Sequence, residues 1–382
     1  LNNWNTSSVT NMLLMFFGAP YSQDLTSWDM NKITKMAFMV NNPDSSQLPR
    51  TTHSFMTRLT YQCDTTTVIQ SPISSPNGSY TWNDGTTIAN NNLPKTLTGG
   101  TKYTLIYEGT FYAMESALSA QAAAGAKCIR SLDHWGSASA AQRANNAFKG
   151  ATNLTDVPDS IPSTLTMMIS MFEGATSLND SSVKTWDVSK VTPMSYMFSG
   201  ATSFNQDLNS WNTGAVTDMS YMFNGASAMN GSLNNWNTAK VTNMDHMFFG
   251  ATSFNQPLNN WNTSSVTNML LMFFGAPYTQ DLTSWDMNKI VKMGFMVNNP
   301  DSDKLPRTTH SFMTRLTYQC DTTTVVQTPI QNPFGSYTWN DGTTIVNNNP
   351  TKTLTGGVKY TLIYEGTFYA MESTHSPQAV AG

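Results

Sequence analysis

Three cysteines are the residues of this chain best suited to covalent chemistry. Cys63 and Cys320 occupy the same position in two copies of a long repeated segment, and Cys128 lies 65 residues after Cys63. A bond between Cys63 and Cys128 would close a loop worth about 4 kcal/mol in the chain-entropy model, and it requires an oxidising compartment. We predict this disulfide; two buried free thiols are the alternative. A partner for Cys320 is expected at the equivalent position, 385, beyond the sequence given.

No residue pattern predicts catalysis, a cofactor or a metal ion. The sequence contains no H-E-x-x-H pair, no glycine-rich phosphate loop, no G-x-S-x-G and no C-x-x-C. We therefore predict no catalytic, cofactor-binding or metal-binding residues, and a protein that is not an enzyme. The histidines are scattered along the chain: His53, His134, His246, His310 and His375.

The composition bounds the partners and the location. Charged residues make up only 12% of the chain, the net charge is −4 and the pI is about 5.7, so no basic footprint for nucleic acid is present. No run of 18 apolar residues predicts a membrane span. Polarity comes from Asn, Thr and Ser, which favours an extracellular or cell-surface location.

A short repeat of about 25 residues must position whatever site exists. Within one unit, Val216, Met219, Met222 and Phe223 follow helical spacing, and the segment that ends at Trp211 suggests a short strand. A helix this short must stack on neighbours. The apolar columns could contact a metal or a ligand, but a shared core is the favoured interpretation. The tryptophan column is Trp186, Trp211, Trp236, Trp261 and Trp285.

Polar residues near the tryptophans are the candidate ligand face. Asn209, Ser210, Asn234 and Asn235 would line the concave strand face, where they could bind surface glycans or host proteins. The Asn or Asp that follows each tryptophan is interpreted as a polar ladder that satisfies backbone groups between coils.

The unit from Phe204 to Ala226 closely resembles the repeats of BspA-like leucine-rich-repeat surface proteins. Trp, Val-Thr-x-Met and Met-Phe-x-Gly-Ala recur together, over about 1–43 and 128–300. The resemblance implies a leucine-rich-repeat-like right-handed solenoid, surface exposure, and a role in adhesion or surface architecture. It implies no catalytic residues.

A second, longer repeat shows modular organisation. Residues 1–116 match residues 258–373 without a gap, at an offset of 257. The module's second element, 44–117, carries Thr-, Tyr- and Val-rich runs and the hairpin signal Asn83-Asp84-Gly85, repeated at 340–342. These features predict a small antiparallel sandwich in the style of Ig-like surface modules.

The predicted fold class is thus a solenoid, with a short strand and a short helix per 25 residues, alternating with small all-β sandwich domains. We expect a structural or adhesive rod or filament of tandem modules, whose partners are further copies of itself. A carbohydrate- or protein-binding receptor is the alternative, and a polysaccharide lyase ranks third. The predicted segments are 1–43, a solenoid end; 44–117, an Ig-like β-domain; 118–300, a solenoid with atypical first coils; 301–373, the second β-domain; and 374–382, a linker.

Overall fold

The structure is a computed structural model that divides into two units, residues 1–215 and 216–382, each considered by itself. The predicted linker 374–382 and the repeated hairpin signal at 340–342 lie outside the described residues. The described residues are 3–12, 15, 28, 56–74, 77–84, 86–89, 94–116, 119–135, 141–292, 313–327, 330–331, 334–339, 344–346, 351–367 and 370–371.

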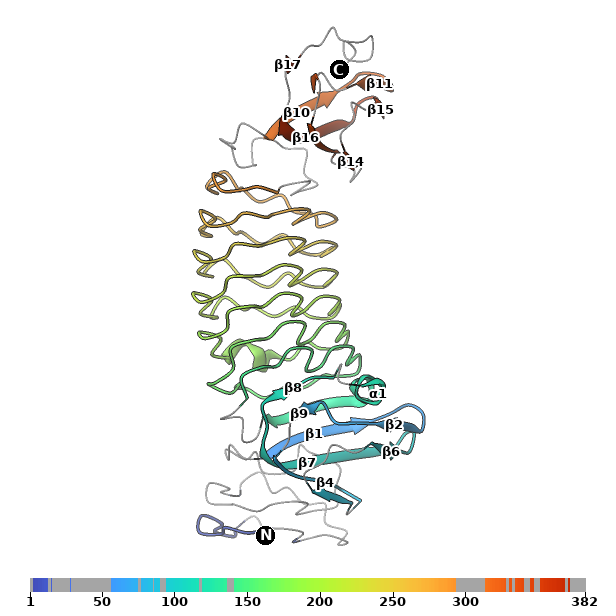
Figure 1. Ribbon diagram of the computed structural model, residues 1–382, viewed down its shortest axis with the longest axis vertical. Coiled ribbons are helices and arrows are strands. Elements are labelled where there is room, and N and C mark those ends of the chain that lie inside the picture. The colour runs from blue at the N-terminus through green and yellow to red at the C-terminus, as the bar shows by residue number, and fades with distance from the viewer. Residues whose placement is uncertain are drawn as a thin grey trace. The chain divides into compact units, whose positions relative to one another are not determined.

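Antiparallel β-structure dominates residues 56–135 of the first unit. Five strands form one sheet in the order β5-β4-β7-β1-β9 (Figure 1). The turn at Asn83-Asp84 connects β4 to β5, as its sequence predicts, and the amide of Trp82 donates to the carbonyl of Thr86 across it, at 2.9 Å. The five strands are β1 (Met56–Gln62), β4 (Asn77–Trp82), β5 (Thr87–Ala89), β7 (Lys102–Thr110) and β9 (Ile129–Trp135).

Two short strand pairs and one helix accompany this sheet. The sheet core contains Leu59, Tyr61 and Leu105, each 0% exposed, and Tyr61 packs on Trp82 at 5.4 Å between ring centroids. Both faces of the interior strand β1 are covered, because its residues 57–61 are buried without interruption. The remaining elements are β2 (Thr67–Ile69) paired with β6 (Lys95–Leu97), β3 (Ile73–Ser74) paired with β8 (Ala113–Met114), and α1 (Ala120–Cys128).

Residues 141–292 form layers of turns that stack at the 25-residue period within each unit. In one layer, the amides of Met222 and Asn224 donate to carbonyls three residues back, at 3.3 and 3.1 Å. The alternate amides, of Tyr221 and Phe223, donate to the next layer, to Asp245 and Met247, at 2.8 and 2.9 Å. Isolated parallel bridges connect equivalent residues of adjacent layers, and the one regular element is a 3₁₀-helix, η3 (Ser181–Thr185).

The solenoid prediction, with a strand and a helix in every repeat and sandwich domains between, is wrong. Within 141–292, the structure has neither a β-strand nor an α-helix; the described residues elsewhere form small antiparallel sheets, with α1 as their one α-helix. The physical reason is a backbone reversal. Each layer places a residue in the left-handed region, such as Tyr196 with φ 59° or Leu271 with φ 51°, and an α-helix requires φ near −63° throughout.

The apolar columns of the repeat do form the interior of the layers. Trp211, Trp236 and Trp261 are each 2–3% exposed, and Met222 and Phe223 are 0% exposed. Each buried Met or Phe contributes about 1.5–3 kcal/mol. Adjacent rings stack: Trp236 and Trp261 lie 6.1 Å apart, inclined by 3°. The Trp261 indole N–H donates to the carbonyl of Leu233, 2.9 Å away, so this tryptophan both fills its layer and bonds that layer to the preceding one.

The second unit repeats the sheet of the first. β10 pairs with β16 in the register of β1 with β7: Met313 faces Glu365 as Met56 faces Glu108. Tyr318, Val326, Trp339, Leu354 and Leu362 form its core. The sheet order is β10-β16-β13-β14. The strands are β10 (Met313–Gln319), β11 (Thr324–Gln327), β12 (Ile330–Gln331), β13 (Phe334–Trp339), β14 (Thr344–Val346), β15 (Thr351–Leu354), β16 (Lys359–Thr367) and β17 (Ala370–Met371).

Candidate functional site

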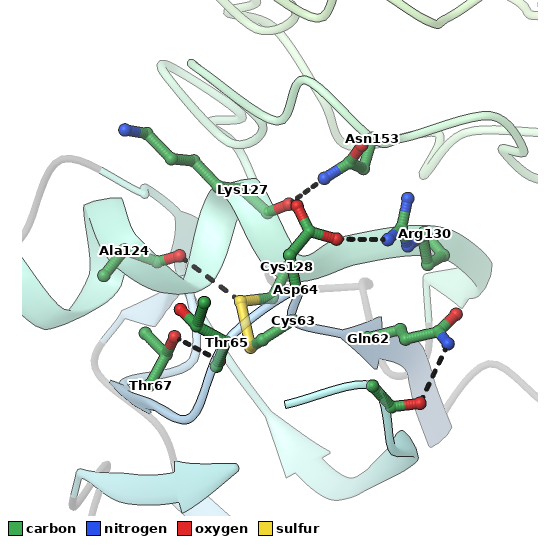
Figure 2. A network of polar contacts seen from close by, with 11 residues as sticks. Gln62, Cys63, Asp64, Thr65, Thr67, Ala124, Lys127, Cys128, Arg130 and Asn153 are labelled. Carbon is green, nitrogen blue, oxygen red and sulfur yellow. Dashed lines mark hydrogen bonds and ion pairs between the residues drawn. A yellow bond between two sulfur atoms is a disulfide. The ribbon is translucent and has the colours of Figure 1, made fainter. Parts of the chain in front are cut away.

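A disulfide lies beside the joint between the first sheet and the layers that follow it, and it fastens α1 and β9 to β1 within that sheet. Cys63, after β1, and Cys128, at the end of α1, are bonded at 2.12 Å, with their Cα atoms 4.4 Å apart. Figure 2 shows this bond beneath the end of the helix. The bond connects the pair of cysteines that the sequence predicts. Both are buried, at 2% and 4% exposure.

A helix holds Cys128 in place. Residues 116–127 are rich in Ala, Ser and Gly, a composition typical of a flexible linker, but the structure places α1 at Ala120–Cys128. Ser119 caps it by accepting a hydrogen bond from the amide of Ala122, at 3.0 Å. Gly125 lets the helix approach β2, since a Cβ there would lie 2.9 Å from the carbonyl oxygen of Gln70. The Ala-rich run therefore contributes helix propensity and rigid packing.

The strand after the helix joins the sheet to the first layers. β9 pairs antiparallel with β1, Leu132 facing Leu59. On its other edge, the amide of Leu132 donates to the carbonyl of Asp156, at 3.1 Å, and the amide of Thr155 donates to the carbonyl of Arg130, at 2.9 Å. β9 is thus hydrogen-bonded on both sides. Backbone pairing continues from the sheet into the layers.

Polar side chains cross the same joint. Arg130 forms an ion pair with Asp64, Nη2 to Oδ1 at 3.3 Å, and the side-chain amide Nδ2 of Asn153 donates to the carbonyl of Lys127, at 2.7 Å (Figure 2). Asp64 is largely exposed, so the ion pair contributes about 0–1 kcal/mol. The Asn153 bond does more to fix the position of the helix, because it connects the end of α1 to a layer.

A second seam binds the layers to the edge strand β8. The amide of Met114 donates to the carbonyl of Arg143, at 3.3 Å, and the hydroxyl of Ser116 donates to the carbonyls of Asn146 and Lys149, at 2.7 and 3.0 Å. The Arg143 guanidinium lies 5.5 Å from the Tyr112 ring centroid. Two seams therefore connect the sheet to the layers, and the disulfide secures α1 and β9, the strand that makes one of these seams.

Buried charges lie along the seam of β1 and β9. Burial lowers the pKa of Arg58, and Asp133 opposes that shift. Burial also raises the pKa of Asp133, and Arg58 opposes this shift in turn. Oδ2 of Asp133 is buried and accepts no hydrogen bond from the described residues. Arg58 stays protonated, and a buried cation needs a counter-charge. Asp133 supplies that charge from β9, so pairing of β1 with β9 is more favourable than pairing with a strand that lacks an acidic residue at this position.

The candidate ligand-face residues lie in turns and bond to their own chain. The amide of Asn209 donates to Asp207, and the hydroxyl of Ser210 donates to the carbonyl of Lys184, at 2.8 Å. Asn234 accepts from the amide of Asn260, at 3.1 Å. Asn235 is exposed in the same turn. The strand face expected to carry these four residues is not formed, and binding at these positions stays a prediction.

The Asn or Asp after each tryptophan does a different task from the one expected. Asp187 accepts from the amide of Ser189, at 3.0 Å, and Asn262 from that of Ser264, also 3.0 Å. These bonds close turns within one layer. The threonine that follows Asn262 makes a bond between layers: the Thr263 hydroxyl donates to the carbonyl of Asp286, at 2.8 Å.

The described residues contain no group of three or more His, Cys, Asp or Glu side chains arranged to hold a metal ion. Within the same residues, no helix is long and apolar enough to cross a bilayer. Sequence reasoning found Cys63 and Cys128 but missed Asn153, Asp156 and Ser116, whose partners are distant backbone groups.

The described residues define a tandem-repeat protein of stacked turn layers and antiparallel sheets. Residues 1–69, 142–240 and 210–311 match a family described as "Mycoplasma protein of unknown function, DUF285". These stretches cover more than half of the chain, which therefore belongs to this family. No curated protein and no solved structure matches the chain.

Proposed function

We propose that the chain is a structural or adhesive protein of the cell surface or extracellular space, in which tandem modules build an extended rod or filament. The observation that carries this proposal is the joint, in which a disulfide fastens α1 and β9 to the first sheet and two backbone seams connect that sheet to the layers that follow. A joint of this kind transmits force and orientation between repeated parts.

The duplication supports the same conclusion. Residues 1–116 recur almost unchanged at 258–373, and the second sheet keeps the register of the first. Repeating a module extends reach and multiplies weak contacts, so avidity rises with every copy. The proposed partners are further copies of the module, or glycans and proteins on another surface.

The location rests on chemistry and on the repeat motif. A structural disulfide persists in an oxidising environment, and low charge with abundant Asn and Thr is compatible with exposure outside a cell. We further propose kinship with BspA-like surface proteins. It rests on the recurring Trp, Val-Thr-x-Met and Met-Phe-x-Gly-Ala motif alone, and not on a leucine-rich-repeat fold.

Electron microscopy of the native full-length protein tests the proposal directly. We expect elongated particles whose length increases in proportion to the number of modules, with the same joint angle at each repeat. Compact particles would refute the proposal. Labelling of intact cells with a membrane-impermeant amine reagent tests location, and labelling only after lysis would exclude surface exposure.

A further inference from the structure

The second sheet presents the strand edge that binds β9 in the first sheet. β1 and β10 have the same sequence, Met-Thr-Arg-Leu-Thr-Tyr-Gln, and pair with β7 and β16 in the same register. In the first sheet, β1 has β9 on its other side. In the described part of the second unit, β10 is the outermost strand. Such an edge is a template for an added strand.

The surroundings of the cysteine are also the same. The amide of Gly100 donates to the carbonyl of Cys63, at 2.8 Å, and that of Gly357 to the carbonyl of Cys320, at 2.7 Å. Cys320 is 9% exposed where Cys63 is 2%, and Tyr318 is 5% exposed where Tyr61 is 0%. The small rise in exposure falls on β10 and the residue that follows it, where β9 would lie.

We propose that the edge of β10, together with Cys320, binds a further copy of the segment Ser119–Trp135, supplied by the next unit of the 257-residue period. This inference rests on the proposed function, because it assumes an array of modules. Cys128 of the segment Ser119–Trp135 is already bonded to Cys63, so the edge of β10 and Cys320 require a different copy of this segment.

The chemistry of the donor segment selects it over an arbitrary strand. Ile129, Leu132 and Trp135 are 0%, 1% and 5% exposed in the first joint, so they bring the apolar surface that the edge covers. The donor cysteine comes directly before its strand, and β10 carries its cysteine directly after its last residue. Antiparallel pairing therefore brings the two sulfurs together, as in the first joint.

The bond can form by thiol–disulfide exchange. The Cys320 thiolate attacks the donor cysteine of a mixed disulfide, a new S–S bond forms, and the former partner leaves as a thiolate with the electron pair. The probe is a synthetic peptide of residues 119–135, activated at its cysteine as a mixed disulfide with thionitrobenzoate, whose release is coloured. It is added to the intact chain with the Cys63–Cys128 bond in place.

The matched control is the same activated peptide carrying Leu132→Asp, which keeps the thiol chemistry and removes apolar complementarity. We expect the native peptide to react with Cys320 at least about tenfold faster, with one equivalent released and the adduct mapped to Cys320. The Cys320→Ser chain should release none. Equal rates for the two peptides, or no reaction at Cys320, would overturn the proposal.

A second measurement avoids the covalent step. A peptide with Cys128→Ser should slow hydrogen exchange at the β10 amides, residues 313–319, and leave the layer amides unchanged; no protection at β10 contradicts the inference. Rod-shaped particles combined with no peptide discrimination would refute this inference and leave the proposed function standing. A faster reaction of the native peptide than of the control peptide, combined with compact particles, would support this inference and refute the proposed function.

Discussion

Removing the disulfide should destabilise the first joint far more than the same chemical change elsewhere. The perturbation is the double replacement Cys63→Ser and Cys128→Ser. The bond closes a loop across a sequence separation of 65, and the chain-entropy model gives about 4 kcal/mol for a loop of this length. The matched control is Cys320→Ser, which replaces a buried cysteine of the second sheet outside this bond.

The assay is native-state hydrogen exchange, since two units make a single global unfolding transition a poor measure. The opening free energy of the β9 amides should fall by about 4 kcal/mol in the double variant, whereas the amides of Met244 and His246, in the layers, should keep theirs. The β1–β9 pairing should survive in the folded state, because Ile129 and Leu132 remain buried. A fall of less than about 1 kcal/mol would refute the loop argument and assign joint stability to packing.

Four further predictions concern the layers. Trp261→Phe should cost about 1–3 kcal/mol by leaving the Leu233 carbonyl without its donor, whereas Trp4→Phe, at a 50% exposed residue, should cost about 0.5 kcal/mol or less; equal losses of opening free energy, measured by native-state hydrogen exchange at the amides around each residue, contradict this. Gly250→Ala should cost about 1–2 kcal/mol because φ is 66°, and Gly250→Asn less in the same hydrogen-exchange assay; the opposite order contradicts the strain argument. Hydrogen bonds from Ser189 lower the pKa of Asp187 below 3.8, so its stabilising contribution is present above pH 3.8 and is lost as the pH falls through the lowered value; Asp187→Asn should remove that step from the acid unfolding curve, and an unchanged curve contradicts it. Asn234→Ala should lower stability by about 1 kcal/mol without a ligand, and loss of glycan-array binding at unchanged stability would instead support the receptor alternative.

Side-chain periodicity predicted which residues are buried but not the backbone that buries them. Trp211, Met222 and Phe223 lie in the interior as their columns indicate. Spacing at i and i+3 suits an α-helix, and it equally suits consecutive turns closed by bonds three residues back. The distinction depends on positive φ at Tyr221 and His246. Tyr does not signal a left-handed conformation, and His, although enriched there, adopts it only in a minority of cases.

At the joint, too, the local sequence predicts individual features but not which strands become neighbours. The pairing of Cys63 with Cys128 followed from counting cysteines per module. The sequence also contains signals for the helix Ala120–Cys128, because Ala is the strongest helix former and Ser119 is a good N-cap. Its small residues are equally typical of a flexible linker, and composition alone does not distinguish the two. The place of β9 beside β1 could not be predicted from local pattern, since strand neighbours are set by tertiary packing.

The bonds between layers have a consequence for how such genes change length. Tyr221 donates to Asp245, and His246, one layer later, donates to Leu270 through the same backbone positions. In-frame loss or gain of one 25-residue layer within 219–274 would place chemically equivalent donors and acceptors opposite each other again. Recombination between the near-identical repeats of this sequence would then yield shorter and longer proteins that still fold, so length polymorphism is a form of variation that this backbone tolerates.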